Sequence, residues 1–256
     1  MAMMTLNPRF LPDLLREAAH LWPQRTAVDF LDKTTSYDAL WRRVQLLAAN
    51  LQANGLEKGK RVGLMLPNCP AYLEFYFATL LAGGIVVNIN PLYAPHELQH
   101  IIEDSDPHFV VTLDLHAMVD KLLPLLGLRR LIVAKMAVQL PPLKAMGFRL
   151  LQRRDIAALP SKALAAETLY ASHHRLRACA VDLHDTAILQ YTGGTTGVSK
   201  GATLVHRNLI ANLLQMEAWL QPALADPRKG PPPAQLNFVC ALPLYHIYAL
   251  VSCMWL

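Results

Sequence analysis

Four short apolar segments, separated by helix-like segments, constrain the fold of this chain more than any other feature. They are 61–66 (RVGLML), 85–89 (IVVNI), 108–114 (HFVVTLD) and 128–135 (LRRLIVAK). Each is apolar almost throughout, which is typical of strands buried on both faces of a parallel sheet. Strands that alternate with helices therefore predict an α/β fold, with mainly parallel sheets flanked by helices.

Helical signals lie before and between these strands. Ser36 is a candidate N-cap, and Gly55 is a candidate stop for the helix that would follow it. Between them, apolar residues recur at helical spacing at Leu40, Val44, Leu47 and Leu51. Residues 70–81 also read as a helix. A further helix is predicted to begin at Pro95, because proline suits the first helical position.

The last third of the chain continues the alternation. Residues 186–192 (TAILQYT) and 201–206 (GATLVH) are predicted strands. Residues 207–220 are a predicted helix with an apolar face, and 238–244 (FVCALPL) are predicted to form another strand.

The pattern divides the chain into three parts. Residues 1–135 form a first α/β subdomain. Residues 136–182 are a less regular, basic connection, expected to run over the surface. Residues 183–256 begin a second subdomain. The chain ends in an apolar run, VSCMWL. Since natural termini usually lie at the surface, we interpret this end as a cut within a buried element.

Composition excludes some classes of protein. The chain has 256 residues, of which 53% are hydrophobic and 17% charged, so it is not a disordered protein. Its net charge of +5 suits an anionic partner. Four cysteines lie far apart and form no CxxC pair, which argues against a zinc or redox motif and favours free thiols in a reducing, cytoplasmic compartment.

Two stretches, 75–96 and 230–256, lack Asp, Glu, Lys and Arg. Glycine, proline and asparagine interrupt both stretches, so we interpret them as buried elements rather than membrane spans. The N-terminus lacks the basic region and the unbroken apolar region of a signal peptide.

Residues 191–202 (YTGGTTGVSKGA) carry the most specific chemistry. Glycines allow backbone N–H groups to surround an anion, while Thr195, Thr196 and Ser199 add hydroxyl donors and Lys200 adds a positive charge. These properties indicate a phosphate-binding loop. A flexible Gly/Thr hairpin turn is the alternative, because the same residues are common in turns.

Two familiar phosphate-binding motifs are excluded. A Walker A loop needs Ser or Thr after its lysine and leads into a helix, whereas Gly201 follows Lys200 and a strand is predicted next. The stretch also lacks the G-x-G-x-x-G pattern of a dinucleotide-binding loop.

The stretch resembles the signature loop of the adenylate-forming (AMP-binding) enzymes, Y-T-S/T/G-G-T-T-G-x-P-K-G. Matching positions are Tyr191, Thr192, Gly194, Thr195, Thr196, Gly197, Lys200 and Gly201. Ser199 replaces the common proline. Gly193 is similar to the variant of bacterial long-chain fatty acid–CoA ligases.

Other segments extend the resemblance. Residues 241–250 (ALPLYHIYAL) resemble a family segment that borders the acyl pocket, with His246 in the place of its histidine. A histidine that merely completes the core is the alternative for His246. Residues 80–106, 36–44 and 205–213 also resemble family segments. The resemblance thus covers nearly the whole chain except about 136–182.

The resemblance implies a fold and a reaction. The fold is the N-terminal part of the large domain, without the C-terminal domain. The reaction is the ATP-dependent activation of a long-chain fatty acid to acyl-CoA through an acyl-adenylate, with ATP, coenzyme A and Mg²⁺. As an N-terminal fragment, this chain is expected to be inactive alone. An aryl- or medium-chain acyl-CoA ligase is one alternative. A non-catalytic nucleotide- or membrane-binding fragment is another, because further segments of the family pattern are expected beyond Leu256.

The resemblance also implies roles for residues. Lys200 would act on the β/γ end of ATP, and His246 would lie near the carboxylate. Thr192 would assist Mg²⁺ through the phosphates. Nucleotide-binding residues would be Tyr191, Thr192, Gly193, Gly194, Thr195, Thr196, Gly197, Val198, Ser199, Lys200, Gly201 and Ala202.

The middle of the chain is basic. Eight basic residues and no acidic one lie between Lys121 and Arg154. Residues 143–154 could form a basic amphipathic helix on the cytoplasmic face of an anionic membrane. A solvated charged face without a partner is the alternative. Nucleic acid is not expected as a partner, because Phe148 is the sole aromatic residue for stacking. A homodimer is a further expectation.

Overall fold

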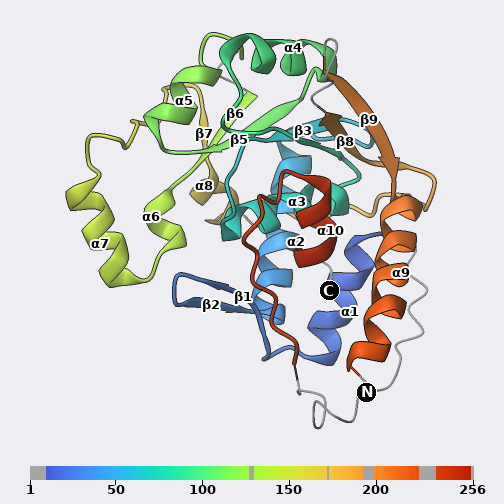
Figure 1. Ribbon diagram of the computed structural model, residues 1–256. Coiled ribbons are helices and arrows are strands. Elements are labelled where there is room, and N and C mark those ends of the chain that lie inside the picture. The colour runs from blue at the N-terminus through green and yellow to red at the C-terminus, as the bar shows by residue number, and fades with distance from the viewer. Residues whose placement is uncertain (1–9, 127–129, 172, 193–198, 225–234, 255–256) are drawn as a thin grey trace.

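The structure is a computed structural model that describes residues 10–126, 130–171, 173–192, 199–224 and 235–254 (Figure 1). Its helices are α1 (Pro12–Leu21), α2 (Tyr37–Ala53), α3 (Pro70–Leu81), α4 (Pro95–Ser105), α5 (His116–Leu122), α6 (Met136–Gln139), α7 (Pro142–Leu151), α8 (Ala166–Ala171), α9 (His206–Leu224) and α10 (Ile247–Met254). Its strands are β1 (Thr26–Phe30), β2 (Lys33–Ser36), β3 (Arg61–Leu64), β4 (Ile85–Asn88), β5 (Phe109–Leu113), β6 (Leu131–Ala134), β7 (Leu164–Ala165), β8 (Thr186–Thr192) and β9 (Lys200–Val205).

The central sheet has seven strands in the order β7-β6-β5-β3-β4-β8-β9. All neighbouring pairs are parallel except β8 and β9, which form an antiparallel hairpin. Helices α4 and α5 lie on one side of the sheet and α2 and α3 on the other (Figure 1). The predicted α/β fold with a mainly parallel, helix-flanked sheet is therefore confirmed. A separate hairpin is formed by β1 and β2.

Local sequence patterns predicted the bounds of several helices correctly. Ser36 caps α2, since its hydroxyl accepts a 3.2 Å hydrogen bond from the backbone N–H of Ala39. The predicted apolar face of α2, from Leu40 to Leu51, is buried. Gly55 follows α2 with a φ of +94°, a left-handed conformation that glycine adopts readily. Helix α3 also has the predicted bounds, 70–81.

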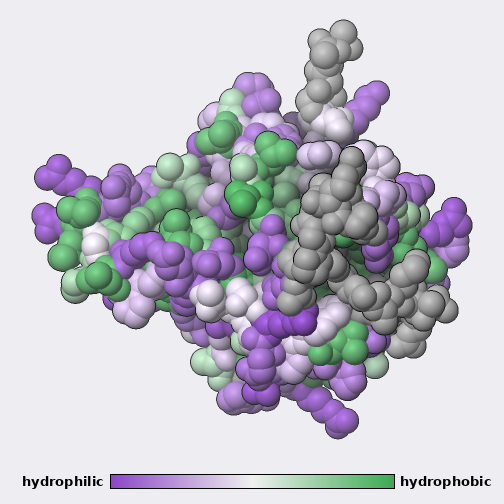
Figure 2. Space-filling view, turned by 60° about the horizontal axis from the view of Figure 1, so that its bottom comes forward, coloured by the Kyte–Doolittle hydropathy of each residue, from purple (hydrophilic) through white to green (hydrophobic). Residues whose placement is uncertain are grey.

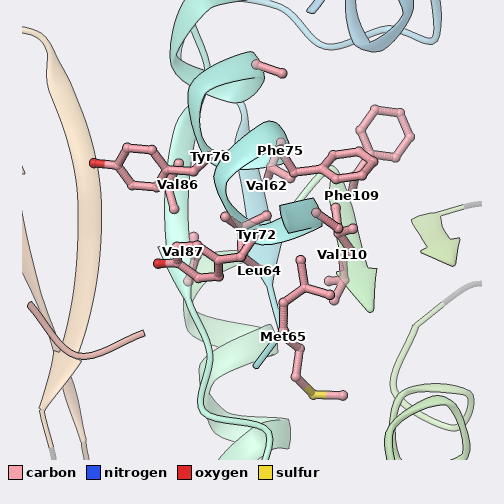
Figure 3. Packing of buried hydrophobic residues seen from close by; sticks show 14 of the residues in the cluster. Val62, Leu64, Met65, Tyr72, Phe75, Tyr76, Val86, Val87, Phe109 and Val110 are labelled. Carbon is pink, nitrogen blue, oxygen red and sulfur yellow. The ribbon is translucent and has the colours of Figure 1, made fainter. Parts of the chain in front are cut away.

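The core centres on β3, β4, β5 and α3. Valines and leucines of the three strands are fully buried against Tyr72, Phe75 and Tyr76 of α3. Figure 3 shows the two tyrosine hydroxyls pointing the same way and Phe75 pointing the other way. The tyrosine rings stack with centroids 6.2 Å apart. Each large buried side chain stabilises the fold by roughly 1.5–3 kcal/mol.

The strand predicted over 238–244 is wrong. This segment has no strand geometry in the structure. Its backbone groups bond to side chains instead: Asn68 binds the carbonyls of Cys240 and Leu242 and the N–H of Leu244. Pro243 has no N–H to give to a ladder.

The middle stretch, 136–182, is more regular than expected. It contains α6, α7, β7 and α8, and β7 extends the sheet beside β6. The hairpin of β8 and β9 joins the same sheet through β4. Where the whole protein divides into subdomains stays a prediction. In the described part of the chain, no helix is both long and apolar enough to cross a membrane.

Candidate functional site

The predicted phosphate loop connects the two strands of the β8–β9 hairpin. Thr192 pairs with Lys200, and Tyr191 pairs with Gly201, across the base of the loop. The predicted nucleotide-binding residues Gly193, Gly194, Thr195, Thr196, Gly197 and Val198 lie outside the described residues. The described ones are Tyr191, Thr192, Ser199, Lys200, Gly201 and Ala202. Both interpretations of the sequence, a hairpin turn and a phosphate loop, are compatible with this geometry.

Helix α4 holds both stems of this hairpin. His100 Nε2 lies 2.8 Å from the carbonyl oxygen of Ser199, on the β9 side. One turn further along α4, the carboxylate of Asp104 accepts a 2.5 Å hydrogen bond from the Tyr191 hydroxyl, on the β8 side. The Ser199 hydroxyl also donates to the Thr192 carbonyl at 2.9 Å, which joins the stems directly. The loop is therefore fixed at both ends by one face of one helix.

Tyr191 explains the glycine after Lys200. A Cβ atom at Gly201 would lie 3.0 Å from Cζ of the Tyr191 ring, closer than ordinary contact. Burial, and then the hydrogen bond to Asp104, raise the pKa of Tyr191, so its hydroxyl stays a donor near neutral pH. Packing against the Tyr191 ring therefore favours glycine at position 201.

Lys200 begins β9, with its side chain exposed. Its ammonium makes no hydrogen bond or ion pair with the described residues. A cation that no carboxylate of this part of the chain neutralises can attract phosphate oxygens.

A buried polar chain, which the sequence interpretation missed, begins on α3. The Tyr72 hydroxyl lies 2.7 Å from Asn88 Oδ1 and 2.9 Å from the carbonyl oxygen of Leu244. The Asn88 amide donates to Gln190 Oε1 at 2.9 Å, and the Gln190 amide donates to the Tyr245 carbonyl at 3.0 Å. The chain links β4 and β8 to the segment that carries His246.

One feature of the sequence points to these hydrogen-bonded polar residues. Asn88 and Gln190 are polar residues in otherwise apolar predicted strands, and buried polar groups need partners. In the structure they are register partners on β4 and β8, so their side chains meet on one face of the sheet. Together with Asn68, just beyond β3, they bind residues 240–245 at the carboxyl ends of three parallel strands. Ligands of open α/β sheets usually bind at this edge.

His246 is exposed and follows directly after residues 240–245. Its ring lies 4.8 Å, centroid to centroid, from the ring of Tyr245. Because Gln190 binds the Tyr245 backbone, His246 lies near the end of β8, where the loop begins. No hydrogen bond joins His246 to Lys200, both of which the structure describes. His246 is not a core histidine.

A metal would have few protein ligands here. The described residues contain no group of three or more His, Cys, Asp or Glu side chains that could hold a metal ion. Thr192 offers one hydroxyl oxygen, whereas Mg²⁺ needs near-octahedral oxygen coordination. This donor set suits a Mg²⁺ ion whose other ligands are phosphate oxygens and water.

An apolar groove of about 570 Å³ lies beside residues 240–245. Met216, Trp219 and Leu220 of α9 form one wall, and Tyr248 and Cys253 of α10 form part of the other. The lining is completed by Gln215, Phe238, Val239, Ala241, Leu242 and Ser252. Such a groove suits an apolar ligand.

Comparison with known proteins decides the family. The sequence profile of the AMP-binding enzymes matches residues 15–256. The chain belongs to the AMP-binding enzyme family. The predicted relationship to adenylate-forming enzymes is therefore confirmed.

Curated members of this family include similar ligases. The long-chain-fatty-acid–CoA ligase of Bacillus subtilis (strain 168) is 33% identical over 256 residues, which cover 97% of this chain and 44% of that protein. The enzyme of the same name from Escherichia coli O6:H1 is 35% identical, covering 97% and 45%. The 4-coumarate-CoA ligase 1 of Narcissus pseudonarcissus is 29% identical, covering 87% and 36%. This chain spans less than half the length of these relatives.

Solved structures share the fold. A Rhodopseudomonas palustris structure named for a long-chain-fatty-acid CoA ligase superposes with a TM-score of 0.72 at 24% identity, covering 96% of this chain and 55% of that one. The anthranilate CoA ligase AuaEII, in complex with anthranoyl-AMP, superposes with a TM-score of 0.66 at 18% identity, covering 81% and 37%. At these identities the likeness concerns the AMP-binding fold alone.

Proposed function

We propose that this chain supplies the phosphate-binding part of an ATP-dependent long-chain-fatty-acid–CoA ligase. In the first step a fatty acid carboxylate oxygen attacks the α-phosphorus of ATP, forming an acyl-adenylate and releasing pyrophosphate. In the second, the thiol of coenzyme A attacks the acyl carbon and AMP leaves. One observation carries the proposal: α4 fixes both stems of a Gly/Thr loop next to the exposed cation of Lys200.

Each site residue has a proposed role. The Gly/Thr composition of 191–202 supports a role in binding the phosphates, and Lys200 stabilises charge at the β/γ end. Thr192 would offer one hydroxyl oxygen to a Mg²⁺ ion bound with the nucleotide, which would supply positive charge to the phosphates. His246 orients the carboxylate, on the segment that Gln190 and Asn68 hold. Phosphoryl transfer of this kind depends mainly on positioning and on charge stabilisation.

The apolar groove between α9 and α10 is the proposed place of the acyl chain. Its lining is mainly aliphatic and aromatic, with few polar groups. A flat aromatic acid is the competing substrate, since 4-coumarate- and anthranilate-CoA ligases are also similar to this chain.

A second candidate function is nucleotide binding without ligation. The chain covers only 44% of the Bacillus subtilis relative, so the residues that complete the reaction can lie on the remainder of a longer protein. This candidate predicts ATP binding without acid-dependent AMP release.

The setting of the protein is part of the proposal. The four cysteines are free thiols, and free thiols are typical of reducing compartments such as the cytoplasm. Because the acid substrate is apolar, we place the protein at the cytoplasmic membrane surface, where a homodimer would present two sites.

The test measures AMP release by the protein purified from its source, after its intact mass has been determined. Palmitate, octanoate and coumarate are compared with and without coenzyme A. The proposal expects palmitate-dependent AMP release above the other two acids. Release that is highest with coumarate would make the protein an aryl-CoA ligase. ATP binding without AMP release for any acid would favour the non-catalytic candidate.

A further inference from the structure

Helix α7 projects from the body of the molecule with its apolar side chains in solvent. Leu143, Met146, Leu150 and Leu151 are between 55% and 84% exposed. In Figure 1 the helix lies at the left margin, joined by α6. The corresponding lobe in Figure 2 shows green apolar surface between purple polar surface. We call α6, α7 and residues 152–154 the α7 lobe.

The exposed stripe is a defined face of a fixed helix. Positions 143, 146 and 150 are three and four residues apart, so they share one face. On the opposite face Ala145 is buried and Phe148 packs against a small cluster that includes Leu140. The helix is thus anchored by one face, while the side chains of the other are mostly exposed.

The basic residues of the lobe surround this stripe. Lys144 and Arg149 flank it on the helix, and Arg153 and Arg154 follow the last turn. The ammonium of Lys144 pairs with Asp32 at 2.5 Å. The three arginines are exposed and form no ion pair with any described residue. Asp155 is the acidic residue next to them.

Some of the basic residues between Lys121 and Arg154 bind other parts of the chain and are not available to the lobe. Lys121 donates to the backbone carbonyls of Pro91 and Tyr93, away from the lobe. Arg130 pairs with Asp106 at 2.7 Å. Arg129 lies outside the described residues. Of the basic residues in the α7 lobe, Arg149, Arg153 and Arg154 are the ones without an ion pair among the described residues.

We infer that the α7 lobe docks on the surface of an anionic lipid membrane. Its leucines and Met146 enter the boundary between headgroups and acyl chains, and the three arginines contact lipid phosphates. Arginine suits this place because its apolar stem covers apolar surface while its head stays in the polar layer. The inference rests on the proposed function in one respect, the membrane as the source of a long-chain acid.

The charges favour lipid over a second copy of the chain. A symmetric contact through the stripe would bring the arginines of two copies together, and like charges across an interface oppose association. A layer of lipid phosphates offers opposite charge over the whole lobe. Anionic lipid is therefore the occupant that matches both the apolar and the cationic side chains.

The experiment is cosedimentation of the 256-residue chain with vesicles of phosphatidylglycerol and phosphatidylcholine, and with phosphatidylcholine alone. We expect binding to the anionic vesicles that weakens as salt is added. Replacing Arg149, Arg153 and Arg154 by Gln should reduce the affinity roughly fivefold for each arginine. Leu150→Ser with Leu151→Ser should reduce it roughly tenfold or more.

Matched controls lie elsewhere on the surface. Leu92→Ser and Lys162→Gln replace exposed side chains outside the lobe and should leave vesicle binding unchanged. All substituted side chains are exposed, so the far-UV circular dichroism of every variant should match the parent chain.

Three results would overturn the inference. They are absent binding to anionic vesicles, binding that ignores salt and both sets of variants, and a dimer that the leucine variants abolish while no vesicle is bound. The assay contains neither nucleotide nor fatty acid. Its failure therefore leaves the ligase proposal untouched, and failure of AMP release leaves the vesicle result untouched.

Discussion

Helix α3 supports two buried polar clusters, which begin only two residues apart and differ in what they hold. Glu74 binds Arg43 through two hydrogen bonds of 2.6 and 3.0 Å and accepts another from the Tyr170 hydroxyl. Tyr72 begins the neutral chain through Asn88 and Gln190 to residues 244 and 245. The first cluster joins helices α2, α3 and α8. The second joins the sheet to the segment of His246.

The difference separates a structural cluster from a positioning one. The carboxylate of Glu74 is 2% exposed, and its partners are side chains of helices in the body of the fold. The amides of Asn88 and Gln190 bind, directly or through Tyr72, the backbone of a segment without regular structure. Loss of the first should therefore affect stability, whereas loss of the second should also affect the site.

The largest effect is expected from Glu74→Gln. The change leaves the guanidinium of Arg43 without its charged partner. Breaking a buried pair from one side costs about 3–5 kcal/mol, and we expect the lower end, about 3 kcal/mol, because the Arg43 side chain is 36% exposed. Urea unfolding measures this free energy. Arg42→Gln is the control, because the Arg42–Asp38 pair is exposed and should contribute at most about 1 kcal/mol. Equal effects of the two changes would contradict a structural role for the Glu74 cluster.

His206 provides a pH-dependent test of another buried polar group. Its Nδ1 accepts a 3.2 Å hydrogen bond from the Leu11 backbone N–H, and burial lowers its pKa to about 4. Above pH 6.5 the ring is neutral in both states and has no effect on the pH dependence. As the pH falls from about 6.5 to 4, the unfolded chain binds the proton first, so stability decreases by up to roughly 3 kcal/mol.

The check is the free energy of unfolding of the parent chain and of His206→Asn between pH 7 and pH 4. Asparagine can accept the Leu11 bond but does not titrate. The variant should lose less stability on acidification than the parent. Parallel pH curves for the two chains would contradict this assignment.

A smaller loss of stability, with a local effect, is expected from Asn88→Ala. Removing the amide leaves Gln190 Oε1 without its donor, at a cost of about 1–3 kcal/mol. Residues 240–246 should then become accessible to limited proteolysis under native conditions. Asn90→Ala, which alters a half-buried side chain whose hydrogen bond to the Leu92 N–H is exposed, is the control. Unchanged proteolysis in the Asn88 variant would mean that the hydrogen bonds of Asn88 and Gln190 do not hold residues 240–246 in place.

The smallest effect on stability is expected from His100→Ala. The ring makes one partly buried contact, to Ser199, so unfolding should change by at most about 1 kcal/mol. ATP affinity should fall severalfold, because the β9 stem of the loop loses its support. His100→Gln, which can place a donor near Nε2, should recover part of the affinity. His96→Ala, on an exposed position of α4, should change neither quantity.

Local patterns predicted much of the fold. Ser36, Gly55 and Pro95 mark real helix boundaries, and the apolar segments near β3, β4, β5 and β6 are strands of one sheet. These features depend on neighbours along the chain. The strand prediction for 238–244 was wrong because Asn68, more than 170 residues away, determines the conformation of this segment.

The candidate site likewise contains residues that the sequence predicted and residues that it did not. The composition of 191–202 indicated phosphate, and resemblance indicated Lys200 and His246. The supports, His100, Asp104 and Gln190, contact residues that are distant in sequence or belong to another strand. Which polar residues meet across a sheet depends on strand order, and no local pattern contains that order.

Binding of Mg–ATP by isothermal titration calorimetry tests the central claim most directly. The parent chain, Lys200→Ala and Lys162→Ala are compared, the last removing an exposed lysine away from the loop. If the β8–β9 loop holds the phosphates, Lys200→Ala weakens ATP binding about tenfold or more, while Lys162→Ala does not. Equal affinities of all three chains for ATP would contradict the assignment of this loop to phosphate.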